Sequence, residues 1–193
     1  MARYLVTGGA GYVGSHCVLA LRERGDEVVV FDNLRMGHRQ AVPEGATLVI
    51  GDLADRAQVR DVFTRGPFDA VLHFASLSLV GESMRMPMRY IADNVGQAMN
   101  LIEAAVEAGC LRFVLSSTAN LFGQPERIPI DESATIAPGS AYGESKYMIE
   151  RALDWAAQVH GLRYAALRYF NAAGADPGGR LGEDHNPETH LIP

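Results

Sequence analysis

Lysine is almost absent from this chain of 193 residues: Lys and Arg together number 17, and Lys146 is the single lysine. Acidic residues outnumber basic ones, so the formal net charge is -6, and no block of consecutive basic residues occurs. Non-specific binding to nucleic acid or to an anionic membrane needs a positive patch, so we expect neither partner. An anionic ligand is still compatible, because backbone amides at a helix N-terminus bind phosphate without net positive charge.

Cysteine and long apolar runs are also scarce. Cys17 and Cys110 are far apart in the chain, and buried free thiols in a reducing compartment are the simplest interpretation. No apolar run approaches the ~20 residues that a membrane span needs. The start MARYLVTGG leaves no room for a signal peptide before the first apolar strand, so we expect a cytoplasmic protein. The histidines show no metal-ligand spacing, and we predict no metal site.

Short apolar runs alternate with longer segments of helical period. Helices are expected from about 13 to 21, 88 to 108 and 140 to 160. Strands alternating with helices predict an α/β fold with a doubly wound parallel sheet of the Rossmann type, about six strands in all. The expected strands, rich in apolar residues and so buried on both faces, are Tyr4–Thr7, Glu27–Phe31, Thr47–Ile50, Ala70–Phe74, Arg112–Ser116 and Arg163–Arg168.

Three glycines, Gly8, Gly11 and Gly14, stand between the first strand and the first helix. Glycine there permits a tight turn and lets backbone N–H groups approach a pyrophosphate at the helix N-terminus. Such a triplet is a weak signal in a chain with 20 glycines. The order strand, glycines, helix, followed by an acid at the right distance, strengthens it into a predicted dinucleotide site.

That acid is Asp32, at the tip of the second strand. A carboxylate there accepts hydrogen bonds from the adenosine ribose and repels a 2′-phosphate, which favours NAD over NADP. A turn-forming Asp-Asn pair is the alternative for Asp32. Asp52, after the third strand, has two equal interpretations: it lies beside the adenine ring, or it caps a helix that begins at about Ala54.

Tyr142 and Lys146 are four residues apart on a predicted helix, so both side chains leave the same face. A lysine ammonium about 4 Å away would lower the pKa of the tyrosine enough for it to act as a base near pH 7. Ser116, Ser117 and Thr118 follow the fifth strand, at the sheet edge where open α/β sheets bind ligands. We expect Thr118 to hydrogen-bond a substrate oxygen; capping of a turn is the alternative.

Seven segments together resemble the UDP-galactose 4-epimerases of the extended short-chain dehydrogenase/reductase superfamily: TGGAGYVGSH, FDNL, GDLAD, HFA, SSTA, YGESKYMIE and RYFNAAGADP. The resemblance implies a tightly held NAD that is regenerated in each turnover. Tyr142 would take the proton of the sugar 4-hydroxyl while hydride leaves C4, with Thr118 hydrogen-bonded to that oxygen. The 4-keto sugar would then rotate and receive the hydride on its other face.

The resemblance also implies site residues and an assembly. Tyr169 and Phe170 would line the nicotinamide pocket, although core aromatics are the alternative, and helices near 88–108 and 140–160 would form a homodimer. Catalysis falls to Tyr142, Lys146 and Thr118, and the UDP-sugar contacts to Thr118, Tyr142, Asn171 and His190. The expected NAD-binding residues are Gly8, Gly11, Tyr12, Val13, Gly14, Asp32, Asn33, Asp52, Leu53, Phe74, Ala75, Asn94, Ser116, Lys146, Tyr169 and Phe170.

Family chains continue well past the last residue of this one. We therefore expect residues 1–170 to be an NAD-binding domain and 171–193 to begin an incomplete UDP-sugar region, with the final strand and most of the substrate domain absent. A non-catalytic NAD-binding module remains an alternative. A 4,6-dehydratase is disfavoured, because Ala119 and Asn120 beside Thr118 supply no acid to expel water. Whether N-acetylated or pentose UDP-sugars are accepted stays open.

Overall fold

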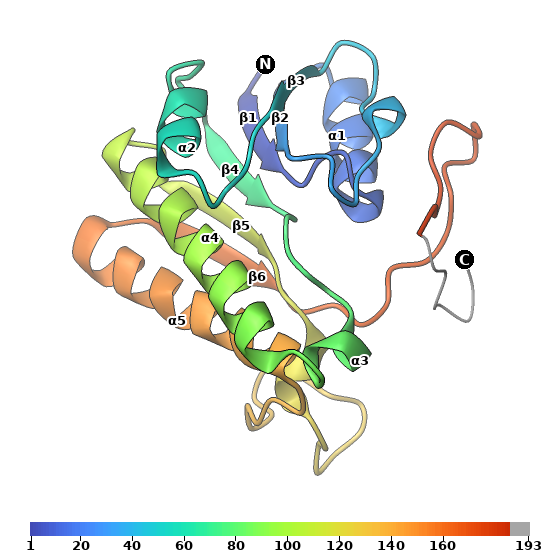
Figure 1. The fold of residues 1–193 in the computed structure, drawn as a ribbon, viewed down its shortest axis with the longest axis vertical. Helices are drawn as coiled ribbons and strands as arrows, with labels where there is room; N and C mark the ends of the chain where they lie inside the picture. Colours follow the sequence, from blue (N-terminus) through green and yellow to red (C-terminus); the bar gives the residue numbers. More distant parts are fainter. Residues whose placement is uncertain (186–193) are drawn as a thin grey trace.

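A six-stranded parallel sheet forms the centre of the molecule in a computed structural model, which describes residues 1–185 (Figure 1). The strand order β3-β2-β1-β4-β5-β6 reverses direction between β1 and β4, which creates the crevice where doubly wound sheets bind nucleotides. The predicted fold class is thereby confirmed. The strands are β1 (Arg3–Thr7), β2 (Glu27–Asp32), β3 (Thr47–Ile50), β4 (Ala70–His73), β5 (Arg112–Ser116) and β6 (Arg163–Leu167).

Helices connect the strands, and the three helices predicted from apolar spacing are present. Apolar spacing did not predict the two short helices α2 and α3, because they have too few turns for a clear period. A helix beginning near Ala54 had been considered, and α2 begins two residues later. The helices are α1 (Tyr12–Glu23), α2 (Arg56–Phe63), α3 (Val80–Ser83), α4 (Pro87–Glu107) and α5 (Ala141–His160), with 3₁₀ turns η1 (Arg39–Ala41) and η2 (Ala119–Phe122).

The sheet is covered on both faces at its centre. Successive strand residues point to opposite faces, so Leu5 joins the core beneath α2, α4 and α5, whereas Val6 packs against α1. Both side chains are fully buried, and each such burial contributes about 1.5–3 kcal/mol. In Figure 1, α4 and α5 lie side by side across one face of the sheet.

We expected all six strands to be buried on both faces. This prediction is wrong for the two edge strands, β3 and β6. In β6, residues Arg163, Ala165 and Leu167 are exposed and the residues between them are partly buried. In β3, Thr47 and Ile50 are exposed. An edge strand borders a single neighbour, and α5 covers β6 from one face only, so the other face meets solvent.

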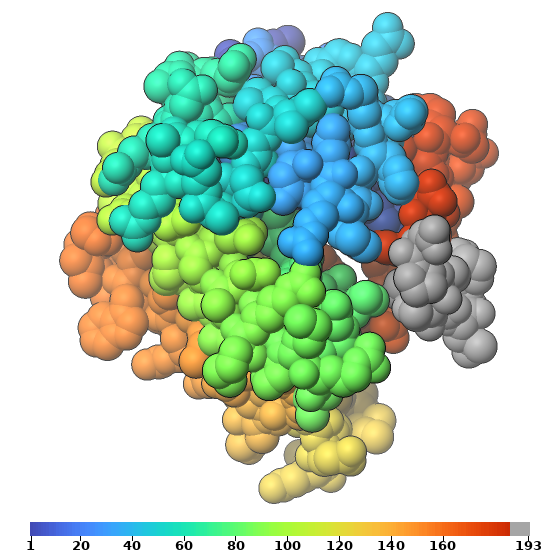
Figure 2. Space-filling view, viewed as in Figure 1, coloured from blue at the N-terminus to red at the C-terminus, as the bar shows by residue number. Residues whose placement is uncertain are grey.

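The segment after β6 is a loop as far as it is described, to residue 185, and it returns to α1. The Tyr12 hydroxyl donates a hydrogen bond to the Gly174 carbonyl, and Arg180 forms an ion pair with Glu23 at 2.8 Å. Figure 2 shows this segment, in red, against the blue N-terminal part of the molecule. The sequence did not predict that this segment packs on α1.

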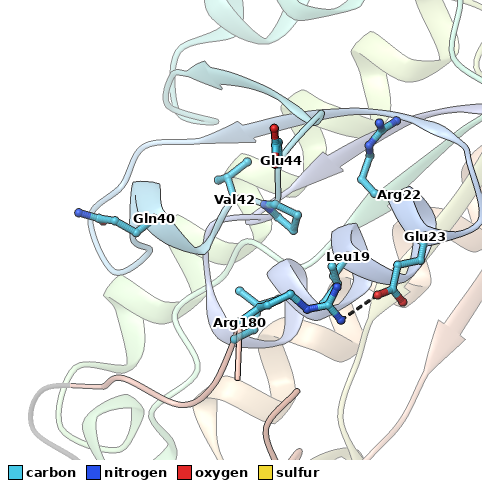
Figure 3. A pocket seen from close by; sticks show the side chains of 9 residues that line it. Leu19, Arg22, Glu23, Gln40, Val42, Glu44 and Arg180 are labelled. Carbon is cyan, nitrogen blue, oxygen red and sulfur yellow. Dashed lines mark ion pairs between the residues drawn. The ribbon is translucent and has the colours of Figure 1, made fainter. Parts of the chain in front are cut away.

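A cavity of about 480 Å³ lies where this loop meets the last turns of α1 and the segment 40–44 (Figure 3). Arg180 enters it from the loop, and its guanidinium is held by Glu23 and by Asp176, the latter at 2.7 Å. The last turns of α1 lie away from the carboxyl edge of the sheet, so this cavity is separate from the expected catalytic position.

Candidate active site

The glycine-rich turn follows β1 and admits no larger residue at two places. Gly8 has φ +73°, and a Cβ there would lie 2.4 Å from the backbone nitrogen of Ala75. A Cβ on Gly14 would lie 2.1 Å from the Gly8 carbonyl oxygen. Because no side chain fills these positions, the turn runs close against the end of β4 and leaves the start of α1 open to a ligand.

The N-terminus of α1 has no cap from a side chain. Gly11 is the N-cap residue, and no acidic residue lies in the first turn. The first N–H groups of a helix have no partner within it and carry partial positive charge. These backbone N–H donors therefore fit the pyrophosphate of a dinucleotide. The pyrophosphate would bring the negative charge that no side chain in the first turn provides.

Asp32, at the end of β2, is buried, with 8% of its surface exposed. Its carboxylate accepts hydrogen bonds from two backbone N–H groups, from Ala10 N at 3.0 Å, inside the glycine-rich turn, and from Leu34 N at 2.8 Å. The second contact is the turn-forming role considered for this residue. Both contacts fix Asp32 at the carboxyl edge beside the turn, where a contact with the ribose remains a prediction.

Asp52 does not cap α2. That cap is Asp55, whose side chain accepts from the backbone nitrogens of Ala57 and Gln58, so the capping interpretation of Asp52 is wrong. Asp52 accepts from Ala54 N at 2.9 Å, in the turn before α2, and from the Asn33 side chain at 3.1 Å, which ties the loop after β3 to the loop after β2. The adenine contact predicted for Asp52 is untested.

The start of α5 brings the expected catalytic residues together. The Thr118 side chain lies close enough to the Tyr142 phenol to lower its pKa. Lys146 is fully buried, and its Nζ donates to the Ser116 carbonyl at 2.9 Å. Ser140 caps the helix by accepting from Gly143 N, and its hydroxyl donates to Asn120 in the turn after Thr118, at 2.9 Å. The geometry thus joins the end of β5 to the helix that carries Tyr142.

The expected effect of Lys146 on Tyr142 is absent from this structure. Burial raises the pKa of Tyr142 to about 12, and only the nearby Thr118 side chain opposes this rise. The Lys146 ammonium lies 5.9 Å from the centre of the Tyr142 ring and is directed at the Ser116 carbonyl. Burial also lowers the pKa of Lys146 to about 7, so near neutral pH its positive charge is itself only partly present.

A pH titration of stability should reveal Lys146. Its pKa is about 7 in the folded chain and near its ordinary value of about 10.5 in the unfolded chain. Between these values the unfolded chain binds more protons, so this group makes the free energy of unfolding rise with pH. We expect the wild type to gain about 1.4 kcal/mol per pH unit, between about pH 7 and 10, relative to Lys146→Met. Urea denaturation of both proteins measures this; parallel curves would contradict it.

Tyr169, Phe170 and Asn171 follow β6 at the same edge of the sheet. The Tyr169 hydroxyl is hydrogen-bonded to the Ser116 side chain. Phe170 is 68% exposed, which excludes the alternative that it is a core aromatic. Asn171 is also exposed. All three are placed where a ligand at the carboxyl edge would meet them, and their roles remain predictions.

Asn94, on α4, is buried and engaged within the chain. Its side chain donates to the Leu77 carbonyl at 3.0 Å and to Ser145 Oγ at 3.0 Å, and it accepts from Leu77 N at 2.8 Å. Asn94 therefore holds the loop after β4 against α4 and α5. A direct contact with a cofactor would have to share or replace these bonds.

Two buried polar residues near the site, His73 and Glu150, were given no role in the prediction from sequence. His73, at the end of β4, is hydrogen-bonded through Nδ1 to Thr7 Oγ1 at 2.7 Å, and its Nε2 is buried without a partner in the described chain. Burial, with the Lys146 charge, lowers the pKa of His73 to about 3, so the ring is neutral. The other is Glu150. Its position four residues after Lys146 was the only signal that could have found it.

The polar cluster near residue 185 lies on the loop at α1. His185 contacts Glu183, and Asp184 lies 3.6 Å from His38. His190, expected to face the substrate, lies outside the described residues. Within residues 1–185, no group of three or more His, Cys, Asp or Glu side chains could hold a metal ion. In the same range, no helix has the length and apolar character to cross a membrane.

This strand order, with an open glycine turn at the start of α1 and an acid at the tip of β2, defines a Rossmann-type dinucleotide-binding fold. The sequence matches one family model over residues 4–193, that of the NAD dependent epimerase/dehydratase family. The chain belongs to this family. The family and the NAD cofactor predicted from the sequence are thereby confirmed.

Curated relatives share about half of their aligned residues with this chain. UDP-glucose 4-epimerase of Halalkalibacterium halodurans is 49% identical over 189 residues, which cover 98% of this chain and 56% of the relative. The enzyme of the same name from Streptomyces lividans is 50% identical over 192 residues, covering 99% and 58%. The chain thus spans little more than half the length of these relatives.

A solved structure is similar to this chain in both sequence and fold. The crystal structure of UDP-glucose 4-epimerase from Brucella ovis in complex with NAD is 42% identical, with a TM-score of 0.96, over 99% of this chain and 58% of that one. With this TM-score, the backbone of the described region closely follows that of a relative crystallised with NAD.

Proposed function

We propose that this chain binds NAD and takes part in the epimerisation of a UDP-hexose at C4, interconverting UDP-galactose and UDP-glucose. The observation that carries the proposal is the contact between Thr118 and Tyr142 beside buried Lys146, at the same sheet edge as the open glycine turn. The names of the relatives support it. Residues 1–170 would hold NAD, and 171–193 would begin the UDP-sugar region.

The chain's own residues supply binding and proton transfer. The chemistry that NAD⁺ would supply when bound is a reversible acceptor for the C4 hydride. The amides of the glycine turn would hold its pyrophosphate and Asp32 its ribose. Tyr142 would remove the proton of the 4-hydroxyl as the C4 hydride leaves, with Thr118 orienting that oxygen, and would return the proton when the hydride comes back to the other face.

Proton removal requires a lower pKa at Tyr142 than the value of about 12 in this structure. A fall to about 7 corresponds to ~7 kcal/mol. Positive charge at Lys146 acts in this direction, and the dry surroundings of the pair strengthen it. A lysine presents a compact charge with three donors, one of which is used at Ser116. The other two are available to a ribose hydroxyl and to the phenol.

The proposal is tested by incubating the purified chain with NAD and UDP-galactose and following UDP-glucose by NMR, together with absorbance at 340 nm. Interconversion without net NADH supports it. Calorimetric titration with NAD, on the same sample, measures cofactor binding separately. Binding of NAD with no conversion of UDP-galactose would refute the epimerase proposal for this chain.

Specific observations bear on two other functions, one of them favourably and the other unfavourably. A non-catalytic NAD-binding module is compatible with a chain that spans 56% of a catalytic relative, and NAD binding alone would identify it. A dehydratase, also within the family's description, would need an acid beside Thr118. Ala119 is buried there, and the Asn120 side chain is engaged by Ser140, so the dehydratase is disfavoured.

We further propose a homodimer through α4 and α5. These neighbouring helices expose large apolar side chains: Met88 at 71%, Trp155 at 59% and Val159 at 68%. Analytical ultracentrifugation at micromolar concentration should give twice the chain mass, and a monomer would refute the dimer. The proposed location is the cytoplasm, because both Cys17 and Cys110 are free thiols.

A further inference from the structure

A polar stripe runs along the inner face of α5. Tyr142, Lys146 and Glu150 follow one another at intervals of four residues, so they share one helix face. Tyr142 lies beside Thr118, whose side chain lowers its pKa, and Lys146 donates to the Ser116 carbonyl. Glu150 accepts from Ser117 Oγ at 2.5 Å. Lys146 and Glu150 therefore hold two successive residues at the end of β5, and Tyr142 lies beside the third.

Glu150 also holds the end of β6. Its side chain is buried, and Arg168 binds it in two-pronged fashion: Nε lies 3.1 Å from Oε1, and Nη2 lies 2.5 Å from Oε2. Glu150 in turn raises the pKa of Arg168, so the arginine stays charged. The Arg168 guanidinium lies over the Phe122 ring, 5.5 Å from its centre. A paired buried charge of this kind is geometrically exacting, and breaking it leaves its partner uncompensated.

The strand ends that meet at Glu150 remain paired beyond the sheet. Ser117 N donates to the Leu167 carbonyl and Ala119 N to the Tyr169 carbonyl, each at 3.0 Å. Tyr169 directly follows Arg168, and its hydroxyl reaches the Ser116 side chain. Fixing Arg168 and Ser117 through one carboxylate therefore fixes Tyr169 and Thr118 relative to α5.

We propose that Glu150 is a positioning residue: its carboxylate sets the spacing between α5, the end of β5 and the end of β6, and so the NAD site they form. This inference rests on the proposed function for its meaning in catalysis. Glu150 touches no reacting atom and acts through Ser117 and Arg168.

The test is Glu150→Gln, which keeps an acceptor for Ser117 and removes the charge that binds Arg168. We expect NAD affinity to fall about tenfold, as for the loss of one charged hydrogen bond. Asp154→Asn is the matched control. Asp154 lies one turn further along α5 and accepts from the Tyr164 hydroxyl at 2.5 Å, so it ties the same helix to the same strand away from the site. It should leave NAD affinity unchanged.

A second readout needs no cofactor. Because Lys146 is the single lysine, ¹³C labelling of lysine gives one Cε resonance and one titration curve. Glu150→Gln should move the midpoint of that curve by about 0.5 pH unit or more, and Asp154→Asn should not. Ser117→Ala, which removes one tie without a charge, should give a smaller change of both readouts and serves if Glu150→Gln does not fold.

The outcomes separate the two proposals. If the wild type fails to bind NAD, the proposed function fails, and the lysine titration still decides the role of Glu150. If Glu150→Gln, or Ser117→Ala in its place, matches the control in lysine midpoint, the positioning role is overturned. An equal loss of NAD affinity in Asp154→Asn would overturn it as well, because it would show a general loosening of α5.

Discussion

Tyr142→Phe should lower the rate of UDP-galactose conversion by about 10³-fold while leaving NAD affinity within about twofold. The substitution removes one oxygen, the atom that Thr118 contacts and that would carry the proton. Phenylalanine keeps the ring in its partly buried place, so the packing of α5 and the glycine turn should not change. A coupled assay for UDP-glucose measures the rate, and calorimetry measures the affinity.

Tyr147→Phe is the control for this prediction. Tyr147 is the next tyrosine on α5 and lies five residues after Tyr142, so it points to a different helix face. Its variant should retain wild-type turnover. Comparable losses in both variants would show that the hydroxyl of Tyr142 has no special role, and the proton-transfer assignment would have to be abandoned.

Gly8→Ala should destabilise the chain far more than Gly109→Ala. Both glycines have φ near +70°, so an alanine is strained at either position, by about 1–2 kcal/mol. At Gly8 the new Cβ would also meet Ala75 N at 2.4 Å, whereas nothing lies within 4 Å of the Cβ position at Gly109. Overpacking of this kind adds about 1–3 kcal/mol. The total of about 3 kcal/mol corresponds to a fall in Tm of about 6–12 °C.

Thermal unfolding of the two variants separates strain from steric conflict. NAD titration adds a second comparison, because movement of the turn against β4 should weaken cofactor binding in Gly8→Ala alone. Equal falls in Tm would mean that the end of β4 yields to the new Cβ, and that the close approach of the turn is not needed for stability.

The sequence predicted the parts of the fold that depend on local pattern. Buried central strands such as β2 are continuous apolar runs, and α4 carries a long amphipathic period, so both were located to within a residue or two. The short helix α2 gives too few turns for a period, and its cap is Asp55, whereas the sequence offered Asp52 as one of two interpretations. Local patterns also could not distinguish the edge strand β6 from the central ones.

In the site, spacing found the residues but not their electrostatics. Tyr142, Lys146 and Thr118 do meet, as their positions on one helix face and one strand end predicted. The effect of Lys146 on the Tyr142 pKa was not foreseen correctly, because burial depends on how the chain packs around both groups. Glu150 was missed for a similar reason: its partners, Ser117 and Arg168, are distant in sequence and meet only in the folded chain.

The open start of α1 links the proposed ligand to the persistence of the folded chain. A helix normally finds its cap in a side chain of its own sequence, and glycine in place of such a residue costs a few tenths of a kcal/mol. Here Gly11 provides none, so a bound pyrophosphate would serve as the cap. A ligand at a hundredfold excess over its Kd stabilises the folded state by about 2.7 kcal/mol. The amount of folded protein in a cell, and its resistance to proteolysis, would then follow the supply of dinucleotide.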